Sequence, residues 1–465
     1  MSAPEAHSTP TIVELGRRLR ARETSSTELT EQALSQLQTT GFHLNAVVTI
    51  TADLARAQAA RADEELASGL DRGPLHGIPY GAKDLLATKD IPTSWGAAPF
   101  RNQHFPNDAA VIERLQAAGA VLVAKLAMVE LAGGFGYDQA NAALTGPGRN
   151  AWDPEAWAGG SSSGSGAAVA AGIVPFAIGS ETWGSITTPA AMNGVTGLRP
   201  TYGRVSRRGA MALAWTMDKI GPLARSAEDC AIVLSAIAGP DPADPSTVAL
   251  PPFSQQTPPL EHFRFALLRR TTNHDDPAVA ANFAASIHTL RRFGTIEEVE
   301  LPDLPFEEAA SLIISAEGAA AFEEFIESGA SAGLTAPEDR AGLYDGLVLP
   351  AVDYLRALRI RRLGARALDR LLAPFDAILA PTLRRVAPPL SESLDAYFGD
   401  DHVPSLGAAG NLCGLPSITV PNGFGQRGLP TALEFMGRAG HEDRIVAAAR
   451  AFQNATSWHT RSPAP

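Results

Sequence analysis

The chain has 465 residues, of which 45% are hydrophobic, and a formal net charge of −12. This size and hydrophobic content suffice for a large core, and length alone would allow about three domains. The negative charge disfavours a general nucleic-acid binder, which would carry a basic patch.

The sequence also lacks the usual features of secreted and membrane proteins. Only two cysteines occur, Cys230 and Cys413, so a disulfide framework is not expected. Residues 1–10 are polar and have no apolar core like that of a signal peptide. The longest run of small apolar residues, 167–178, is about 12 residues long and broken by glycine and proline, too short to span a bilayer. We expect a cytoplasmic protein with no membrane partner and no nucleic-acid partner.

Helices are predicted for the N-terminal residues 11–70. Apolar residues recur at helical spacing from Ile12 to Leu19. Ser25 and Glu28 fit a capping box at the start of a second helix.

Alternating strands and helices are predicted for the segment that follows. The hydrophobic pattern predicts buried strands at 74–86, 120–124 and 173–178, and helices at 108–118 and 165–171. Gly119 fits the end of the first of these helices. The helix at 165–171 is rich in alanine and glycine, so it can pack tightly, and its N-terminus would point at the serine-rich residues before it.

The C-terminal half shows the same alternation after a proline-rich crossover at 239–262, which we interpret as an ordered surface segment rather than a flexible linker. The predicted strands are 263–268, 296–301 and 376–379, and the predicted helices are 278–293, 306–329 and 350–373. This alternation indicates an α/β region within the same sheet. Residues 381–405 are predicted to form a long loop, of the kind that often serves as a lid.

Two stretches of nearly bare backbone carry most of the functional signal. Residues 159–166 read Gly-Gly-Ser-Ser-Ser-Gly-Ser-Gly, and residues 180–185 read Ser-Glu-Thr-Trp-Gly-Ser. Glycine lets a backbone approach a ligand closely, and serine supplies a nucleophile or a proton carrier. A serine hydroxyl needs a base to activate it, and no histidine lies in or between these stretches. Lys83, in an apolar stretch upstream, can act as that base, because a buried lysine can be neutral near pH 7.

Each of these features has an ordinary structural explanation when taken alone. A loop rich in glycine and serine is usually a flexible connection or a phosphate cradle, but the cradle needs Gly-Lys-Ser/Thr where this chain has Gly164-Ser165-Gly166-Ala167. Lys83 alone would be a solvated surface lysine, and Ser185 alone would be a turn or cap residue. Only their combination indicates a catalytic site.

Together these residues resemble the amidase signature family of hydrolases. The similarity covers most of the chain from about residue 74 and is weak only between about 240 and 370. Further similar segments are found at 123–130, 194–205, 375–382 and 411–416. The resemblance implies an α/β fold, a single large α/β/α sandwich around a central mixed β-sheet, with residues 1–465 as one domain. Its expected parts are N-terminal helices at 1–70, a catalytic core at 74–238, the crossover at 239–262, a helical α/β subregion at 263–375 and a C-terminal part of the core at 376–465.

The resemblance also implies a role for each of three residues. Lys83 matches the family's base, Ser161 its bridging serine and Ser185 its nucleophile. Neutral Lys83 would take a proton from Ser161, Ser161 would take one from Ser185, and Ser185 would attack a carbonyl. In this family a cis peptide holds the bridging serine. The expected activity is hydrolysis of a carboxamide through an acyl-enzyme, with neither a metal nor a cofactor.

The oxyanion that forms during such an attack needs N–H donors aimed at it. The matching backbone is that of Thr182, Trp183, Gly184 and Ser185. A helix N-terminus at the serine loop would also favour negative charge nearby, and would thereby help to keep Lys83 neutral.

The chain departs from the family's common pattern at this turn. Many relatives have glycine at the place of Trp183, aspartate at that of Glu181 and arginine at that of Thr187. The Trp183 indole either lines the acyl pocket, where it would favour flat or apolar groups, or packs outward in the core. Asp218 and Arg199, in neighbouring segments, are interpreted as structural.

Three functions remain open at this point. The first is an amidase for broad acyl or aryl amides that also accepts esters or carbamates. The second is the glutaminase subunit of a tRNA-dependent amidotransferase, which the changes at Trp183 and Thr187 disfavour because a small zwitterionic substrate calls for charged anchors. The third is a non-catalytic scaffold of the same fold, against which the intact Lys-Ser-Ser set argues. We expect a small-molecule substrate and a monomer or homodimer.

Overall fold

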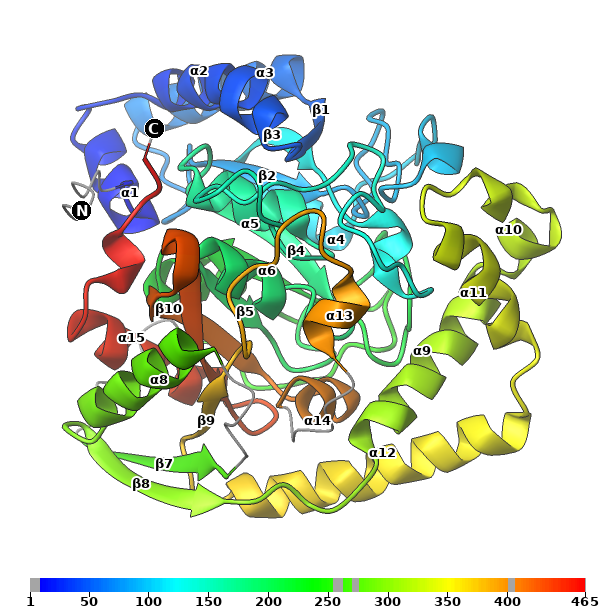
Figure 1. Ribbon diagram of the computed structural model, residues 1–465. Coiled ribbons are helices and arrows are strands. Elements are labelled where there is room, and N and C mark those ends of the chain that lie inside the picture. Colours follow the sequence, from blue (N-terminus) through cyan, green and yellow to red (C-terminus); the bar gives the residue numbers. More distant parts are fainter. Residues whose placement is uncertain (1–8, 254–261, 270–275, 400–405, 465) are drawn as a thin grey trace.

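The computed structural model describes residues 9–253, 262–269, 276–399 and 406–464. Its strands are β1 Val47–Ile50, β2 Pro79–Lys83, β3 Val121–Leu126, β4 Phe176–Glu181, β5 Thr196–Arg199, β6 Lys219–Ala224, β7 Phe263–Leu268, β8 Gly294–Val299, β9 Ala377–Pro381, β10 Ser417–Phe424 and β11 Pro430–Met436. They form one eleven-stranded sheet in the order β1-β3-β2-β4-β6-β5-β10-β11-β9-β7-β8. Figure 1 shows β1 and β3 at one end of the molecule and β7 and β8 at the other. β2 runs parallel to β3 and β4, and β7 runs parallel to β8 and β9, whereas β10 is antiparallel to β5 and β11. The predicted α/β fold around a large mixed sheet is confirmed.

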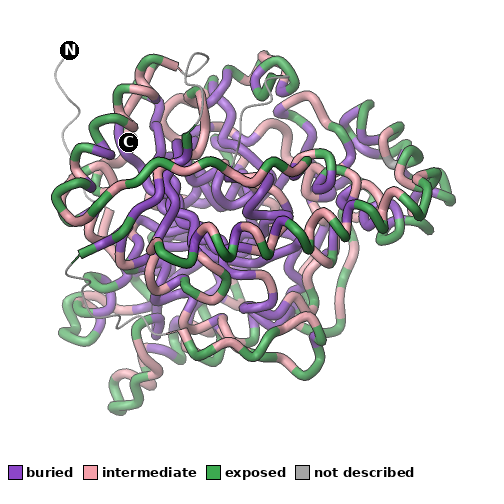
Figure 2. The backbone as a smooth tube through the Cα atoms, turned by 90° about the horizontal axis from the view of Figure 1, so that it is seen from below, coloured by how far each residue is buried: buried purple, intermediate pink, exposed green. Residues whose placement is uncertain are grey.

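Helices pack on both faces of this sheet. They are α1 Ile12–Arg20, α2 Ser26–Gln36, α3 Ala52–Ala67, α4 Ala110–Ala117, α5 Ser163–Ala170, α6 Thr187–Asn193, α7 Ala227–Ile237, α8 Pro277–Leu290, α9 Phe306–Ala321, α10 Glu323–Glu327, α11 Pro337–Leu347, α12 Ala351–Leu372, α13 Leu394–Phe398, α14 Leu406–Leu412 and α15 Glu442–Asn454. Side chains alternate between the faces of a strand, and in β3 Leu122 belongs to one buried apolar cluster whereas Val121 and Val123 belong to another. Figure 2 shows the buried residues gathered in the middle of the molecule. No helix within the described ranges is long and apolar enough to cross a membrane.

Several predicted elements differ from those observed. The N-terminal residues 11–70 are not all helical, because the β-branched run at 47–50 forms β1 and pairs with β3. The strand predicted at 173–178 begins only at Phe176 and continues to Glu181, so that Ser180 lies inside it. Strands β5, β6, β10 and β11 were not predicted. They are buried along their lengths, and the periodicity of such strands does not set them apart from other apolar segments.

The two segments that were expected to be irregular are only partly described. The crossover at 239–262 is described to residue 253 and again from residue 262, and the described part forms no helix or strand. The predicted loop at 381–405 contains the short helix α13, and its residues 400–405 lie outside the described ranges.

Helix α5 packs closely against the backbone just before β1 and just after β3 because its residues are small. All eight of its residues are buried. A Cβ atom placed on Gly164 would lie 2.4 Å from the carbonyl oxygen of Ala46 and 2.5 Å from the amide nitrogen of Ala127. Both contacts are with backbone, which cannot rotate aside. The glycines of the serine-rich stretch therefore fix how closely its helix approaches the sheet.

Substitution of Gly164 by alanine should destabilise the protein. The new methyl group would overlap two backbone atoms, and such overpacking costs about 1–3 kcal/mol. Urea unfolding followed by circular dichroism measures this loss. The control is Ser35→Ala on the exposed face of α2, which should shift stability by less than about 0.5 kcal/mol. Equal stability of Gly164→Ala and the control would contradict the close packing of α5.

Candidate active site

Lys83 is the last residue of β2 and its side chain is completely buried. Its Nζ lies 2.7 Å from Oγ of Ser161 and 2.9 Å from Oγ of Ser180. Burial lowers the pKa of Lys83 to about 7, against the opposing pull of the Asp218 and Glu181 carboxylates. An amine with this pKa is substantially neutral at neutral pH, so Lys83 can accept a proton. The predicted proximity of Lys83 and Ser161 is therefore present in the structure.

The serine loop precedes α5 and contains a cis peptide between Gly160 and Ser161. Gly159 has a φ of +77°, and a Cβ there would lie 2.9 Å from the Cα of Pro189. Glycine at position 159 is thus required by its surroundings as well as by its backbone conformation. The carbonyl oxygen of Ser161 accepts a hydrogen bond from the amide of Val129 at 3.1 Å, which fixes the loop on its other side.

Ser185 lies in the turn that connects β4 to α6 and is 8% exposed. Its carbonyl oxygen accepts a hydrogen bond from the amide of Ser162 at 3.3 Å, so the two glycine-rich loops are in direct contact. Gly184, before it, has a φ of +87°, which favours glycine. The structure thus brings the three predicted residues to the same edge of β2 and β4.

Glu181 fixes the end of this turn through hydrogen bonds to backbone amides. Its Oε2 accepts hydrogen bonds from the amides of Ile186 at 2.8 Å and Thr187 at 2.9 Å, which are the N-cap residue and the first residue of α6. Its Oε1 accepts a hydrogen bond from Arg199 at 2.7 Å, and both side chains of this ion pair are fully buried. Burial alone would raise the pKa of Glu181, but Arg199, Lys219 and the hydrogen bonds outweigh it and lower the pKa to about 2. Arg199 is therefore structural, as interpreted from the sequence.

Asp218 fixes the beginning of the same turn. It accepts hydrogen bonds from the Thr182 hydroxyl at 2.6 Å and from the amides of Leu213 and Ala214. Burial raises its pKa, against the effect of these hydrogen bonds. These contacts agree with the structural role that the sequence suggested. They also show that Asp218 holds the turn through Thr182.

Three polar residues of the site were missed from the sequence. Ser180 contacts the Lys83 amine, Lys219 donates hydrogen bonds to Thr182 and Asn411, and Asn411 also donates to Glu181 at 2.9 Å. Ser180 was within reach of sequence reasoning, because it lies five residues before Ser185 in the same motif. Lys219 and Asn411 join the site only through the pairing of distant strands and helices.

Beside the turn lies a cavity with a volume of about 410 Å³. Its lining includes Thr182, Trp183 and Ser185, and Trp183 is a partly buried residue that also packs against the main apolar core. Residues of α9 and α11 also line this cavity. Among the described residues that line it, Asp345 carries the one ionisable side chain.

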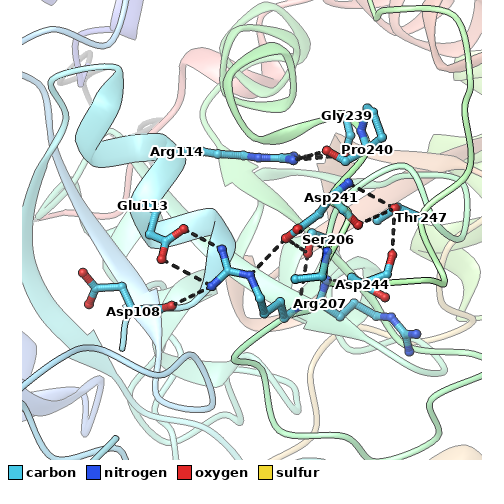
Figure 3. A network of polar contacts seen from close by, with 12 residues as sticks. Asp108, Glu113, Arg114, Ser206, Arg207, Gly239, Pro240, Asp241, Asp244 and Thr247 are labelled. Atoms are coloured by element: carbon cyan, nitrogen blue, oxygen red, sulfur yellow. Dashed lines mark hydrogen bonds and ion pairs between the residues drawn. The ribbon is translucent and has the colours of Figure 1, made fainter. Parts of the chain in front are cut away.

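A smaller cavity of about 190 Å³ shares Ala132, Thr182 and Leu213 with the first, and extends to Ser180 and Lys219. Arg207 and Asp244, which line this cavity, belong to a polar network (Figure 3). In this network Ser206 donates to Asp241, the amide of Arg207 donates to Asp244, and Arg208 pairs with Glu113 and Asp241. These contacts tie the segment at 206–208 to α4 and to the crossover.

The described residues include no group of three or more histidine, cysteine or carboxylate side chains that could hold a metal ion. What the site offers to a substrate is a lysine amine, serine hydroxyls and backbone N–H groups. Such a set suits nucleophilic attack on a carbonyl carbon.

Comparison with known proteins identifies the family of this chain. The sequence profile of the amidase family matches residues 28–446. The chain is 38% identical to a glutamyl-tRNA(Gln) amidotransferase subunit from Methylococcus capsulatus, over 98% of each chain. The crystal structure of the native peptide amidase from Stenotrophomonas maltophilia matches with a TM-score of 0.84 and 34% identity, over 99% of each chain. The corresponding amidotransferase subunit from Thermotoga maritima matches with a TM-score of 0.79 and 28% identity, over 98% of this chain and 97% of that one. The chain therefore belongs to the amidase signature family.

Proposed function

We propose that this protein hydrolyses a carboxamide through an acyl-enzyme, with Ser185 as nucleophile, Ser161 as bridging residue and Lys83 as base. The observation that carries the proposal is the fully buried Lys83 amine, 2.7 Å from the Ser161 hydroxyl. A base works best when its pKa is close to the working pH, and burial brings the pKa of Lys83 to about 7. Ser180 accepts the second contact of the amine and so holds it in place.

The reaction then follows in two halves. Ser185 Oγ attacks the amide carbon while its proton passes to Ser161, and the Ser161 proton passes to Lys83. The tetrahedral intermediate collapses, the C–N bond breaks, and the leaving amine takes the proton back along the same relay. Water then attacks the Ser185 ester with the same residues as acid and base, and the carboxylic acid leaves.

The negative oxygen of both intermediates requires preorganised donors. The backbone N–H groups of Thr182, Trp183, Gly184 and Ser185 are the proposed set, because they form the turn between β4 and α6. One such donor is worth about 3 kcal/mol to the transition state. Glu181 and Asp218 hold this turn by hydrogen bonds to its ends, so the donors need little rearrangement during the reaction.

The lining of the larger cavity favours an apolar or aromatic acyl group. Phe135 and Trp183 supply aromatic surface, and the one ionisable side chain among its described residues is the Asp345 carboxylate. A carboxylate-bearing acyl group would meet no cation there and would be repelled by Asp345. An activated serine also attacks esters and carbamates, so aryl amides, esters and carbamates form the proposed substrate range.

A second candidate is the glutaminase role within an amidotransferase complex. It is favoured by the 38% identity to an amidotransferase subunit over almost the whole chain. The larger cavity offers no cation for the carboxylate of free glutamine among its described residues, whereas Asp345 suits the ammonium group of glutamine and the adjoining smaller cavity is lined by Arg207 and Arg208. Release of ammonia from glutamine, measured with and without partner subunits and ATP, separates the two candidates. Glutamine turnover that depends on those partners would support the second and contradict the first.

Replacement of Lys83, Ser161 or Ser185 by alanine should lower kcat on the order of 10⁴-fold, because the three residues act as one unit.

The proposed relay needs Lys83 neutral, so kcat/KM of the wild type should rise with pH up to about 7 and fall about tenfold per unit below it. Steady-state hydrolysis of an aryl amide measures both effects. Lys89→Ala, at an exposed position, is the matched control and should keep full activity. Near wild-type rates in Lys83→Ala would refute the relay.

Substitution of Trp183 by glycine should change the acyl preference. Loss of the indole surface is expected to lower kcat/KM for aryl acyl groups about tenfold relative to acetyl groups. Asp345→Asn, which keeps the shape of the side chain, should improve only substrates whose acyl group carries a carboxylate. A series of p-nitroanilides of graded acyl size and charge measures both effects. An unchanged profile in both variants would show that this cavity does not hold the acyl group.

A further inference from the structure

Lys219 is a second buried lysine beside the catalytic turn, and the proposed proton relay does not use it. It is the first residue of β6, it is 2% exposed, and it pairs across the sheet with Glu181 of β4. Its Nζ donates hydrogen bonds to the Thr182 carbonyl oxygen at 3.3 Å and to Oδ1 of Asn411 at 2.7 Å. A buried amine with two such partners has a fixed position and a fixed direction.

The Thr182 carbonyl belongs to the same peptide group as the Trp183 N–H. A hydrogen bond to a carbonyl oxygen draws electron density through the peptide and makes its N–H a stronger donor, an effect that a charged donor increases. Trp183 N–H is one of the donors proposed for the oxyanion. Lys219 therefore contacts, at its carbonyl end, the same peptide group whose N–H is proposed to face the oxyanion.

Asp218, the preceding residue, strengthens this arrangement. It accepts a hydrogen bond from the Thr182 hydroxyl at 2.6 Å, whereas Lys219 donates one to the Thr182 carbonyl oxygen. Two consecutive residues therefore hold both the side chain and the backbone of Thr182. Thr182 can then neither rotate its peptide nor shift along the strand without breaking a buried hydrogen bond.

The charges around Lys219 nearly balance. Burial and the guanidinium groups of Arg199 and Arg207 oppose its ammonium form, whereas the carboxylates of Glu181 and Asp218 favour it, and together they lower the pKa of Lys219 to about 7. One further charged group lies at the edge of this cluster. Glu434 of β11 is 4.0 Å from Arg199, and burial raises its pKa, while Asn411 of α14 contributes no charge.

We propose that protonated Lys219 is a positioning residue that orients and polarises the Thr182–Trp183 peptide toward the oxyanion. The inference rests on the proposed function, because it concerns the oxyanion of that same reaction. It gives the two buried lysines opposite requirements: Lys83 must be neutral and Lys219 must be charged. Activity should accordingly pass through a maximum near neutral pH, with Lys83 setting the acid limb and Lys219 the alkaline limb.

The test compares Lys219→Met, which removes the donor, with Lys219→Gln, which keeps a neutral donor for the Thr182 carbonyl. Complete loss of one oxyanion donor costs 10²–10³-fold in kcat, so weakening one should lower kcat of Lys219→Met about tenfold to hundredfold, with KM nearly unchanged. Lys219→Gln should recover part of this loss, and in both variants the alkaline limb should disappear. Lys89→Met, at an exposed position, is the matched control.

A second readout depends on the oxyanion site alone. An arylboronic acid forms a tetrahedral adduct with an active serine, and its inhibition constant should weaken in Lys219→Met by the same factor as kcat. Circular dichroism confirms folding, and Lys219→Gln serves the test if the methionine variant does not fold. An alkaline limb that persists in Lys219→Gln, or an unchanged boronate affinity, would overturn the inference. Absence of turnover in the wild type would instead overturn the proposed function, and the inference with it.

Discussion

The burial of the Lys83 amine is the constraint around which this site is organised. An ammonium group loses most of its hydration at the end of β2, so the amine becomes a base near neutral pH. Hydroxyl groups contact it, at 2.7 Å and 2.9 Å, and no carboxylate among the described residues forms a direct ion pair with it. A carboxylate in their place would restore the charge and remove the base. The glycine-rich loops and the close approach of α5 serve to bring these hydroxyls to it.

Around this neutral centre the protein places its charges on the turn that carries Ser185. Glu181, Arg199, Asp218 and Lys219 are all buried, and each makes hydrogen bonds to the turn or to a partner that does. Burial of such charged groups costs desolvation free energy, and their attraction to one another offsets this cost. The result is a rigid backbone whose N–H groups have fixed directions, as oxyanion stabilisation requires.

The grouping of Lys83, Ser161 and Ser185 in one candidate site could be predicted because their short motifs resemble those of the amidase signature family. The fold class followed from the same resemblance. The contacts of Lys219 and Asn411 could not be predicted, since 192 positions separate these residues and only the sheet and α14 bring them together. β1 was missed because four β-branched residues within a helical region carry too weak a periodic signal. The buried strands β10 and β11 were missed for a different reason. Both of their faces are covered, so their sequences do not alternate between apolar and polar residues.

Reaction with a serine-directed fluorophosphonate, located by peptide mass spectrometry, tests the central claim most directly. We expect a single adduct at Ser185, formed at a rate that rises as pH increases through about 7 and lost in Lys83→Ala. Labelling at another serine, labelling of Lys83→Ala at the wild-type rate, or no labelling of the folded wild-type protein would contradict a buried lysine that activates Ser185.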